Sequence, residues 1–453
     1  KLLWEKLSNI LLDYGFKMGS DKCTFSYFDN EANRYISVSL YVDDALVMAK
    51  TERDCRFVMA LFWSKGMKLT GEFNARRHCG YDIKYYRNKR DGTKAMALSM
   101  QQYTAKLRSK YQDKVNESKK PRKLPANPRM SEKDFEKVFL LDQNLYRKEE
   151  VTRAREFVGS VMFLACRTGY DIAAAVSRLA RTMTKPSKLW HESASWLMQY
   201  IHTESQRMPA LIYYEASKAA SLNPILAGMS DSSWRSTSNN RSMMSNICML
   251  GWGKRWSLIS HSSSLSVATG LSTGEAESYG LCRQMVTLQG KANLQRQEGF
   301  KCQPHPSGDN TCSLINAITG KQNMLHMPHF TQHTHDVIVE KLCERPEHVN
   351  TFANWSDVGT KALKDANDFA HKISYILTST CSKEWNDEWE EIEDKEYSRV
   401  VTMRMINDEC ASFGLTVSQK MIDYLNETEK KEVELKSRQR VDSKVNHCLT
   451  VEH

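Results

Sequence analysis

The stretch that decides the fold reads PILAGMSDSSW at residues 224–234, NICMLGWGKRWSLIS at 246–260 and ATGLSTGEAESYGL at 268–281. Asp231 closes a short apolar run that is typical of a strand, and Glu275 and Glu277 begin a run that is typical of a helix. Short apolar runs of this kind predict strands near 224–230, 246–252, 255–260 and 265–269, and a helix over about 275–298.

Two further acids follow this stretch, Asp309 in SGDNTCSLINA and Asp357 in NWSDVGTKAL. An isolated acid at a strand end followed by an acidic helix is a common way to build a metal site for phosphodiester chemistry. Together with Asp231 and one of the two helix glutamates, these acids could hold two magnesium ions about 4 Å apart with a phosphate between them.

The composition fits a multidomain globular protein. The chain has 453 residues, of which 41% are hydrophobic and 26% are charged, and its formal net charge is +10. A positive charge permits a polyanionic partner. We find no apolar run of about 18 residues and no signal peptide, so we expect no membrane span. The 12 cysteines include no CxxC pair, which argues against a disulfide scaffold and fits a reducing compartment.

A second acidic feature lies in YISVSLYVDDALVMA at residues 35–49. Apolar and polar residues alternate up to Asp43 and Asp44, and an apolar run then resumes, which predicts a hairpin with an acidic turn. Adjacent carboxylates repel each other, and a bound divalent cation would offset that repulsion. A solvated turn is the alternative on residue types alone.

The remaining chain is organised in three parts. Residues 99–223 are expected to be helical and basic, either gripping a nucleic-acid backbone or presenting a solvated face, with a linker or mobile loop over 113–134. Residues 224–373 alternate strands and helices, as an α/β domain does; the last two elements are a strand near 348–352 and a helix from about 355. From about 376 the chain is charged, and we expect an exposed, partly disordered helical tail.

Several blocks, in order, resemble the polyprotein of copia-type LTR retrotransposons. They are LWEKLSNILLDYGF, YVDD, REFVGSVMFLACRTGYDIAAAVSRLAR, GMSDSSW, NNRSMMSNICMLG, STGEAESYGL, GDNTCSLINA, MPHFTQHTHDVIVE and WSDVGTKAL. The resemblance covers the second half of the reverse transcriptase and the attached RNase H. It implies a multidomain protein of α/β and α+β class, with a partial palm at 1–98, an α-rich thumb or connection at 99–223 and an RNase H-like α/β domain at 224–375. The charged tail at 376–453, which we expect to be helical or partly disordered, lies outside the resemblance.

For the nuclease, the resemblance implies that Asp231, Glu277, Asp309 and Asp357 bind Mg²⁺ (or Mn²⁺). It favours Glu277 over Glu275. The implied partner is an RNA–DNA hybrid, recognised by its A-form shape and its 2′-hydroxyl groups. The implied location is intracellular, either cytoplasmic in a virus-like particle or nuclear.

For the polymerase, the resemblance implies that Asp43 is a metal ligand and that Asp44 supports it. The family's third polymerase Asp belongs to a segment that would precede Lys1. We therefore expect no polymerase activity from this chain alone, because a two-metal site needs that carboxylate.

Some positions depart from the family pattern. Residues 260–266 read SHSSSLS where the family has basic residues, Thr331 replaces an acidic residue after His329, and Tyr170 replaces a proline. These departures favour a second hypothesis, a decayed or co-opted element that binds nucleic acid without catalysis.

A histidine cluster comprises His326, His329, His333 and His335. It is expected to be structural or to face the hybrid rather than to bind zinc, because no cysteine completes a ligand set.

Overall fold

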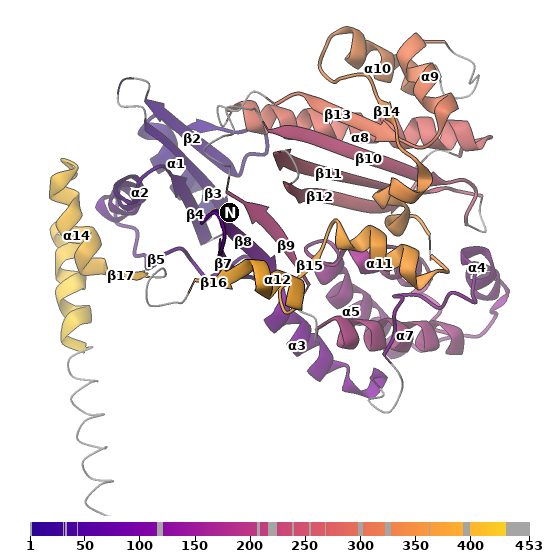
Figure 1. Cartoon of the computed structure of the whole chain (residues 1–453). Coiled ribbons are helices and arrows are strands. Elements are labelled where there is room, and N and C mark those ends of the chain that lie inside the picture. The colour runs from indigo at the N-terminus through magenta and orange to yellow at the C-terminus, as the bar shows by residue number, and fades with distance from the viewer. Residues whose placement is uncertain are drawn as a thin grey trace, which may run out of the picture. The chain divides into compact units, whose positions relative to one another are not determined.

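The computed structural model describes residues 2–29, 31, 34–42, 44–115, 121–205, 209–215, 224–237, 240–252, 255–267, 269–297, 302–321, 328–361, 363–392 and 399–431. The chain divides into two compact units (Figure 1). The first unit comprises Lys1–Cys79 with Glu393–His453, and the second comprises Gly80–Ile392. The fold is mixed α/β with several sheets, as expected, whereas the four-segment division remains a prediction.

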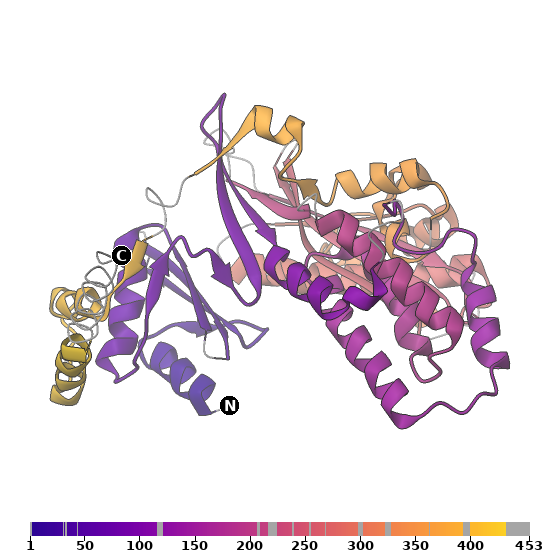
Figure 2. The same ribbon diagram turned by 90° about the horizontal axis from the view of Figure 1, so that it is seen from below.

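The first unit contains an antiparallel sheet covered by two helices. Its strands lie in the order β1-β2-β3-β4, and its first two helices are α1 (Leu2–Asp13) and α2 (Glu52–Ser64). The strands are β1 (Lys17–Met18), β2 (Thr24–Asp29), β3 (Arg34–Tyr41) and β4 (Asp44–Ala49). Figure 2 shows the two helices beside the strands of this sheet. Ile36, Val38 and Leu40 alternate along β3 and are buried in one cluster with residues of both helices. The predicted hairpin over 35–49 is confirmed, because period-two alternation places its apolar residues on one face.

Part of the charged tail returns to the first unit and packs there. β17 (Arg399–Val401) pairs with β5 (Gly71–Phe73), and α14 (Met403–Ser412) packs on α2. Ile406 and Cys410 are buried in this contact, and residues 419–431 are helical. The prediction of an exposed tail is therefore wrong for residues 399–412, because the apolar residues of α14 recur at helical spacing and cover α2. Residues 432–453 lie outside the described part of the chain.

One sheet of the second unit combines segments that are far apart in the sequence. Its strands lie in the order β15-β9-β8-β7-β16. They are β7 (Tyr81–Asn88), β8 (Lys94–Ser99), β9 (Pro209–Tyr214), β15 (Thr378–Ser379) and β16 (Trp389–Glu391). β7 and β8 form an antiparallel hairpin, whereas β9, β15 and β16 were not predicted. The strand β6 (Arg77–His78) precedes this unit in the chain.

Residues 376–392 of the tail belong to the second unit and supply two strands of this sheet, β15 and β16. Trp385 in α12 (Lys383–Glu388) and Trp389 in β16 are buried, and their rings stack with centroids 5.1 Å apart. Tyr214 lies against Trp389 at 5.7 Å between ring centroids. The acidic composition of residues 383–391 suggested an exposed helix. That prediction is wrong here too, because the two tryptophans of the segment are buried against the sheet.

This packing predicts that Trp389→Ala lowers the free energy of unfolding by about 3–5 kcal/mol, because a large buried side chain is replaced by a cavity. Denaturant unfolding followed by circular dichroism measures the change. Phe352→Ala is the matched control, since Phe352 is 76% exposed in the same unit, and its effect should stay within about 0.5 kcal/mol. Equal stability of the two variants would contradict the packing of the tail.

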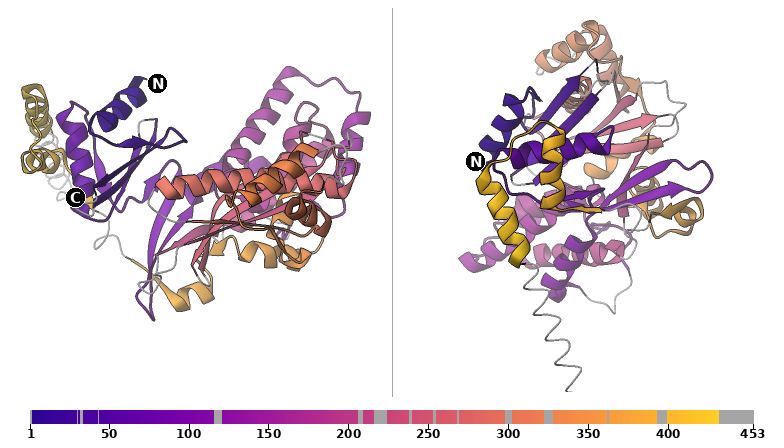
Figure 3. Two further views of the ribbon diagram at one scale, coloured as in Figure 1. Left: turned by 90° about the horizontal axis from the view of Figure 1, so that it is seen from above. Right: turned by 90° about the vertical axis from the view of Figure 1, so that its left-hand side faces the viewer.

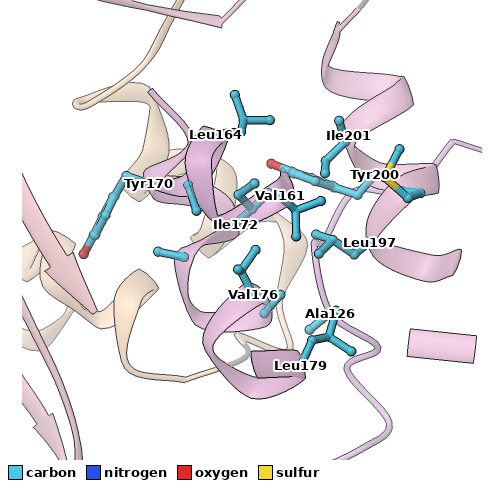
Figure 4. Close-up of a cluster of buried hydrophobic side chains, with 14 of the residues drawn as sticks. Ala126, Val161, Leu164, Tyr170, Ile172, Val176, Leu179, Leu197, Tyr200 and Ile201 are labelled. Carbon is cyan, nitrogen blue, oxygen red and sulfur yellow. The ribbon is translucent and has the colours of Figure 1, made fainter. Parts of the chain in front are cut away.

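A helical layer follows β8 in the chain. It contains α3 (Gln101–Lys110), η1 (Gln112–Lys114), α4 (Glu132–Leu141), α5 (Lys148–Ala165), η2 (Tyr170–Ile172), α6 (Ala173–Thr182) and α7 (Lys188–Ser205). Apolar side chains at helical spacing on α5, α6 and α7 meet in one core, which includes Val161, Val176 and Leu197 (Figure 4). None of the helices among the described residues combines the length and the apolar character that crossing a bilayer requires.

The predicted linker over 113–134 is partly ordered by contacts with this layer. Leu124 and Ala126 are buried, and Trp196 Nε1 donates a hydrogen bond of 2.9 Å to the carbonyl oxygen of Leu124. The expectation of a mobile loop is therefore wrong for residues 121–130, because apolar residues between the prolines and lysines pack on α7. Residues 116–120 lie outside the described part.

The second sheet of this unit has five strands in the order β12-β11-β10-β13-β14. They are β10 (Ile225–Ser233), β11 (Met243–Trp252), β12 (Arg255–Leu265), β13 (Pro304–Gly308) and β14 (Glu347–His348). The pairs β10–β11 and β11–β12 are antiparallel, whereas β10–β13 and β13–β14 are parallel. The separate strand predicted near 265–269 is wrong, because β12 runs without a break to Leu265.

Both faces of the five-stranded sheet are covered. The helix α8 (Thr273–Gln297) lies along one face (Figure 3). Leu226 and Cys248 are buried in one cluster with residues of α8, while Ile247 and Met249 are buried in the core of the helical layer. The helices α9 (Thr311–Thr319) and α10 (Pro328–Val339) pack on α8.

The chain after β14 continues through η3 (Thr351–Ala353), η4 (Trp355–Gly359) and α11 (Ala366–Ser374). The predicted strand near 348–352 is therefore only Glu347–His348. The predicted helix from about 355 begins at Ala366 instead, where the Asp365 side chain caps the helix.

Candidate metal centre

The acids singled out in the sequence lie on four elements around one end of the five-stranded sheet. Asp231 is in β10, and Asp309 directly follows β13. Because β10 and β13 are parallel, with Ser230 opposite Gly308, the two carboxylates leave neighbouring strands at the same end. Asp357 lies in η4, which packs against β10 and β11.

Three of these carboxylates converge. One oxygen atom from each of Asp231, Asp309 and Asp357 lies within 4.8 Å of the others. Asp231 and Asp357 are buried, and Asp309 is half-buried. The cluster is therefore shielded from solvent at Asp231 and Asp357 and reaches solvent at Asp309.

The two glutamates of α8 have different partners. The backbone amide of Ser232, next to Asp231, donates a hydrogen bond of 3.3 Å to Glu277 Oε1. Glu275 instead accepts a hydrogen bond of 2.5 Å from the backbone amide of Leu271, just before the helix. Glu277 therefore faces the acidic cluster, while Glu275 caps the start of α8.

Hydroxyl groups orient two of the aspartates. The Thr360 hydroxyl donates a hydrogen bond to Asp231 Oδ2, and Thr351 Oγ1 donates one of 3.1 Å to Asp309 Oδ2. Each bond fixes one carboxylate oxygen and leaves the other available as a ligand.

Two lysines pair with the third aspartate. Lys372 Nζ donates a hydrogen bond of 2.5 Å to Asp357 Oδ2, and Lys361 Nζ lies 2.7 Å from Asp357 Oδ1. Lys372 is 2% exposed and Asp357 is 1% exposed, whereas Lys361 is 44% exposed. Lys372 also lies 3.7 Å from Asp368. Asp357 is therefore held by one buried cation and one cation at the rim.

The proximity of these acids changes their proton affinities. Burial, together with the charge of Asp357, raises the pKa of Asp231 to about 7, although Lys361 opposes this shift. Burial and the charges of Asp231 and Asp309 raise the pKa of Glu277 well above its usual value. Burial alone would lower the pKa of Lys361, but Asp231 and Asp357 outweigh it and raise that pKa.

These observations fit a hard divalent cation. Carboxylate oxygens are the ligands that Mg²⁺ prefers. Burial is the main cause of the raised carboxyl pKa values, and a bound cation would offset both the burial of these charges and their mutual repulsion. Asp231, Asp309, Asp357 and Glu277 are the side chains that would hold it. Lys361 and Lys372 would compete with it for Asp357.

Comparison with known proteins gives one informative match. No family model matches the chain. A protein of Saccharomyces cerevisiae (strain S288c), named as a transposon Ty5-1 protein, is 28% identical over 221 residues. The match covers 48% of this chain and 65% of the yeast protein, so it spans less than two thirds of that relative.

The similarity supports a retrotransposon origin.

The hairpin of the first unit that carries the sequence YVDD is only partly described. Asp43 lies outside the described residues. Asp44 begins β4 and is exposed, and Val42 in the turn has a φ of 57°. The metal role predicted for Asp43 remains a prediction.

The departures from the family pattern have structural counterparts. The segment SHSSSLS continues strand β12 rather than forming a loop, except for its last serine, and Arg283 on α8 donates a hydrogen bond of 3.1 Å to Ser264 Oγ. Tyr170 is buried, and its hydroxyl lies 2.9 Å from Ser245 Oγ and donates to the Ser356 carbonyl oxygen at 3.2 Å. The tyrosine thus joins η2 to the sheet and to η4.

The predicted histidine cluster forms no metal site among the described residues. His335 Nδ1 lies 3.2 Å from the carbonyl oxygen of Ala317, which links α10 to α9. His329 and His333 are exposed, and His326 lies outside the described residues.

Sequence reasoning missed four residues of the site, Thr351, Thr360, Lys361 and Lys372. Thr360 and Thr351 carry no sequence signal beyond their nearness to acids. Lys372 lies in a helix that begins with polar residues, where a lysine is expected to be solvated. Its burial beside Asp357 depends on how α11 packs against η4.

Proposed function

We propose that the second unit is a retrotransposon RNase H that cleaves the RNA strand of RNA–DNA hybrids with Mg²⁺ (or Mn²⁺). The observation that carries this proposal is the convergence of Asp231, Asp309 and Asp357 at one end of the five-stranded sheet. The order β12-β11-β10-β13-β14, with α8 crossing one face, supports an RNase H-like fold. We further propose that the β3–β4 hairpin of the first unit derives from a reverse-transcriptase palm.

The side chains of the site have distinct roles in this proposal. Bound magnesium supplies a Lewis acid that activates a water and neutralises charge on the phosphate. Thr360 and Thr351 keep the Asp231 and Asp309 carboxylates in one orientation, so that little reorganisation is needed when substrate binds. Lys361 at the rim provides a positive charge for the hybrid backbone. Cleavage is largely independent of sequence, because A-form shape and 2′-hydroxyl groups select the hybrid.

One observation favours the alternative, a nucleic-acid-binding element without catalysis. Lys372 and Lys361 contact both oxygens of Asp357, where a metal ligand would need an available lone pair. If these pairs persist when nucleic acid binds, the site keeps its fold and lacks an essential ligand.

Hybrid cleavage decides between the two. The full chain, incubated with a labelled RNA–DNA hybrid, should cut the RNA strand with Mg²⁺ and not with a chelator. Asp309→Asn should lower the rate by at least about a hundredfold, because it removes a ligand of the proposed site. Asp387→Asn is the matched control, since Asp387 is exposed in the same unit. Equal rates for wild type and Asp309→Asn would support the alternative.

A further inference from the structure

A second cluster of metal-ligating side chains lies in the first unit. Asp44, His78 and Cys79 each offer one ligand atom, and the three atoms lie within 4.8 Å of one another. Cys79 Sγ is 3.2 Å from His78 Nε2. Asp44 is exposed and the other two are half-buried, so an ion from solvent can reach them.

The backbone explains how two adjacent residues reach one point. Consecutive side chains of an extended strand point to opposite faces, so a His-Cys pair does not normally converge. Cys79 has a φ of 49° and Gly80 a φ of 86°, both in the left-handed region. This turn at the end of β6 brings the thiol back towards the imidazole. Asp44 comes from a distant part of the sequence, at the start of β4.

We propose that Asp44, His78 and Cys79 form a zinc-binding site. Zinc accepts sulfur, nitrogen and oxygen ligands at about 2.0–2.3 Å in tetrahedral geometry, which places neighbouring ligand atoms about 3.3–3.8 Å apart. The observed spacings lie within about 1 Å of these values. Magnesium and calcium prefer all-oxygen sets, so a thiol and an imidazole select zinc.

Among the described residues, the site has three protein ligands. A fourth position remains for water or an exchangeable group, as in zinc sites that are not purely structural. A bound zinc ion would tie the β3–β4 turn to the segment that ends at Cys79. Because the site lies in the first unit, it does not depend on the nuclease proposed for the second.

Cobalt substitution tests the site directly. The full chain, stripped of metal with a chelator and titrated with Co²⁺, should develop a near-ultraviolet thiolate-to-cobalt charge-transfer band that added Zn²⁺ abolishes. Cys79→Ser should remove the band and weaken zinc binding by more than about a hundredfold, since loss of an outer partner alone costs 10–100-fold. Cys23→Ser is the matched control, because Cys23 is exposed in the same unit. Circular dichroism confirms that each variant is folded.

Each further outcome is informative. Asp44→Asn and His78→Ala should each weaken zinc binding while the Cys23→Ser control does not. A thiolate band that persists in Cys79→Ser, or a wild-type chain that develops no such band, overturns the proposal; the cluster would then be a thiol–imidazole contact only. Asp309→Asn should leave the band unchanged, so failure of the nuclease and failure of the zinc site are distinguishable.

Discussion

Asp231→Asn should stabilise the metal-free protein at neutral and alkaline pH while abolishing cleavage of the hybrid. The folded state keeps the Asp231 proton up to about pH 7, whereas an unfolded chain releases it near the ordinary value of 3.8. Between these pH values the unfolded state binds fewer protons, so the free energy of unfolding falls as pH rises. Asparagine has no proton to lose, and the variant should be more stable by roughly 2–4 kcal/mol above pH 7.

The measurement is denaturant unfolding at several pH values in the presence of a chelator. The wild type should lose stability from about pH 4 to pH 7, and the variant should lose less. Asp387→Asn should follow the wild type. Mg²⁺ should raise the free energy of unfolding of the wild type, by about 2.7 kcal/mol at an Mg²⁺ concentration of a hundred times the dissociation constant. It should leave the free energy of unfolding of the variant nearly unchanged. A variant less stable than wild type at pH 8 without metal would show that Asp231 is not under electrostatic strain.

Lys372→Met should have the opposite effect on the metal-free protein. Lys372 and Asp357 are almost fully buried and are joined by a hydrogen bond of 2.5 Å. Breaking a buried ion pair by removing one partner costs about 3–5 kcal/mol, because the remaining charge is left uncompensated. Lys361 still lies beside Asp357 in the variant. We therefore expect the free energy of unfolding to fall by about 3 kcal/mol, near the lower end of this range.

The same substitution should favour the metal. With its buried competitor removed, Asp357 becomes a better ligand, so the Mg²⁺ concentration that half-restores stability should fall about tenfold, equivalent to about 1.4 kcal/mol. Lys364→Met, an exposed lysine in the same segment, is the control. Lys361→Met should change stability by at most about 1 kcal/mol, because its side chain is partly solvated. If Mg²⁺ stabilises Lys372→Met and wild type equally, Lys372 does not compete for the site.

Local patterns predicted much of the secondary structure. Alternation of Ile36, Val38 and Leu40 placed β3 and its hairpin, and the helix predicted over about 275–298 lies close to the observed bounds of α8. These patterns succeed because strands and helices repeat over two and 3.6 residues, whatever they pack against. The strands β9, β15 and β16 show no such alternation. β15 and β16 contain only two and three residues, and all three strands pair with residues far away in the sequence.

The tail shows that amino-acid composition alone does not predict which residues are buried. Glutamates surround Trp385 and Trp389, so the segment has the composition of an exposed helix. The fold buries the two rings and leaves most of the acids exposed, because only side chains that face the sheet lose contact with water. Average composition cannot report which side of a short element faces the core.

The sequence by itself determined which acids are candidate ligands: Asp231 and Asp309 at strand ends, Glu277 at the start of a helix, and Asp357 in a polar segment. Only the tertiary structure decided that three aspartates converge and that Lys372 is buried against one of them. The type of a residue sets the chemical groups that it offers, and this information is contained in the residue itself. The electrostatic environment depends on atoms contributed by segments more than a hundred residues apart, and it decides which of those groups holds a proton, pairs with a lysine or remains available to a cation.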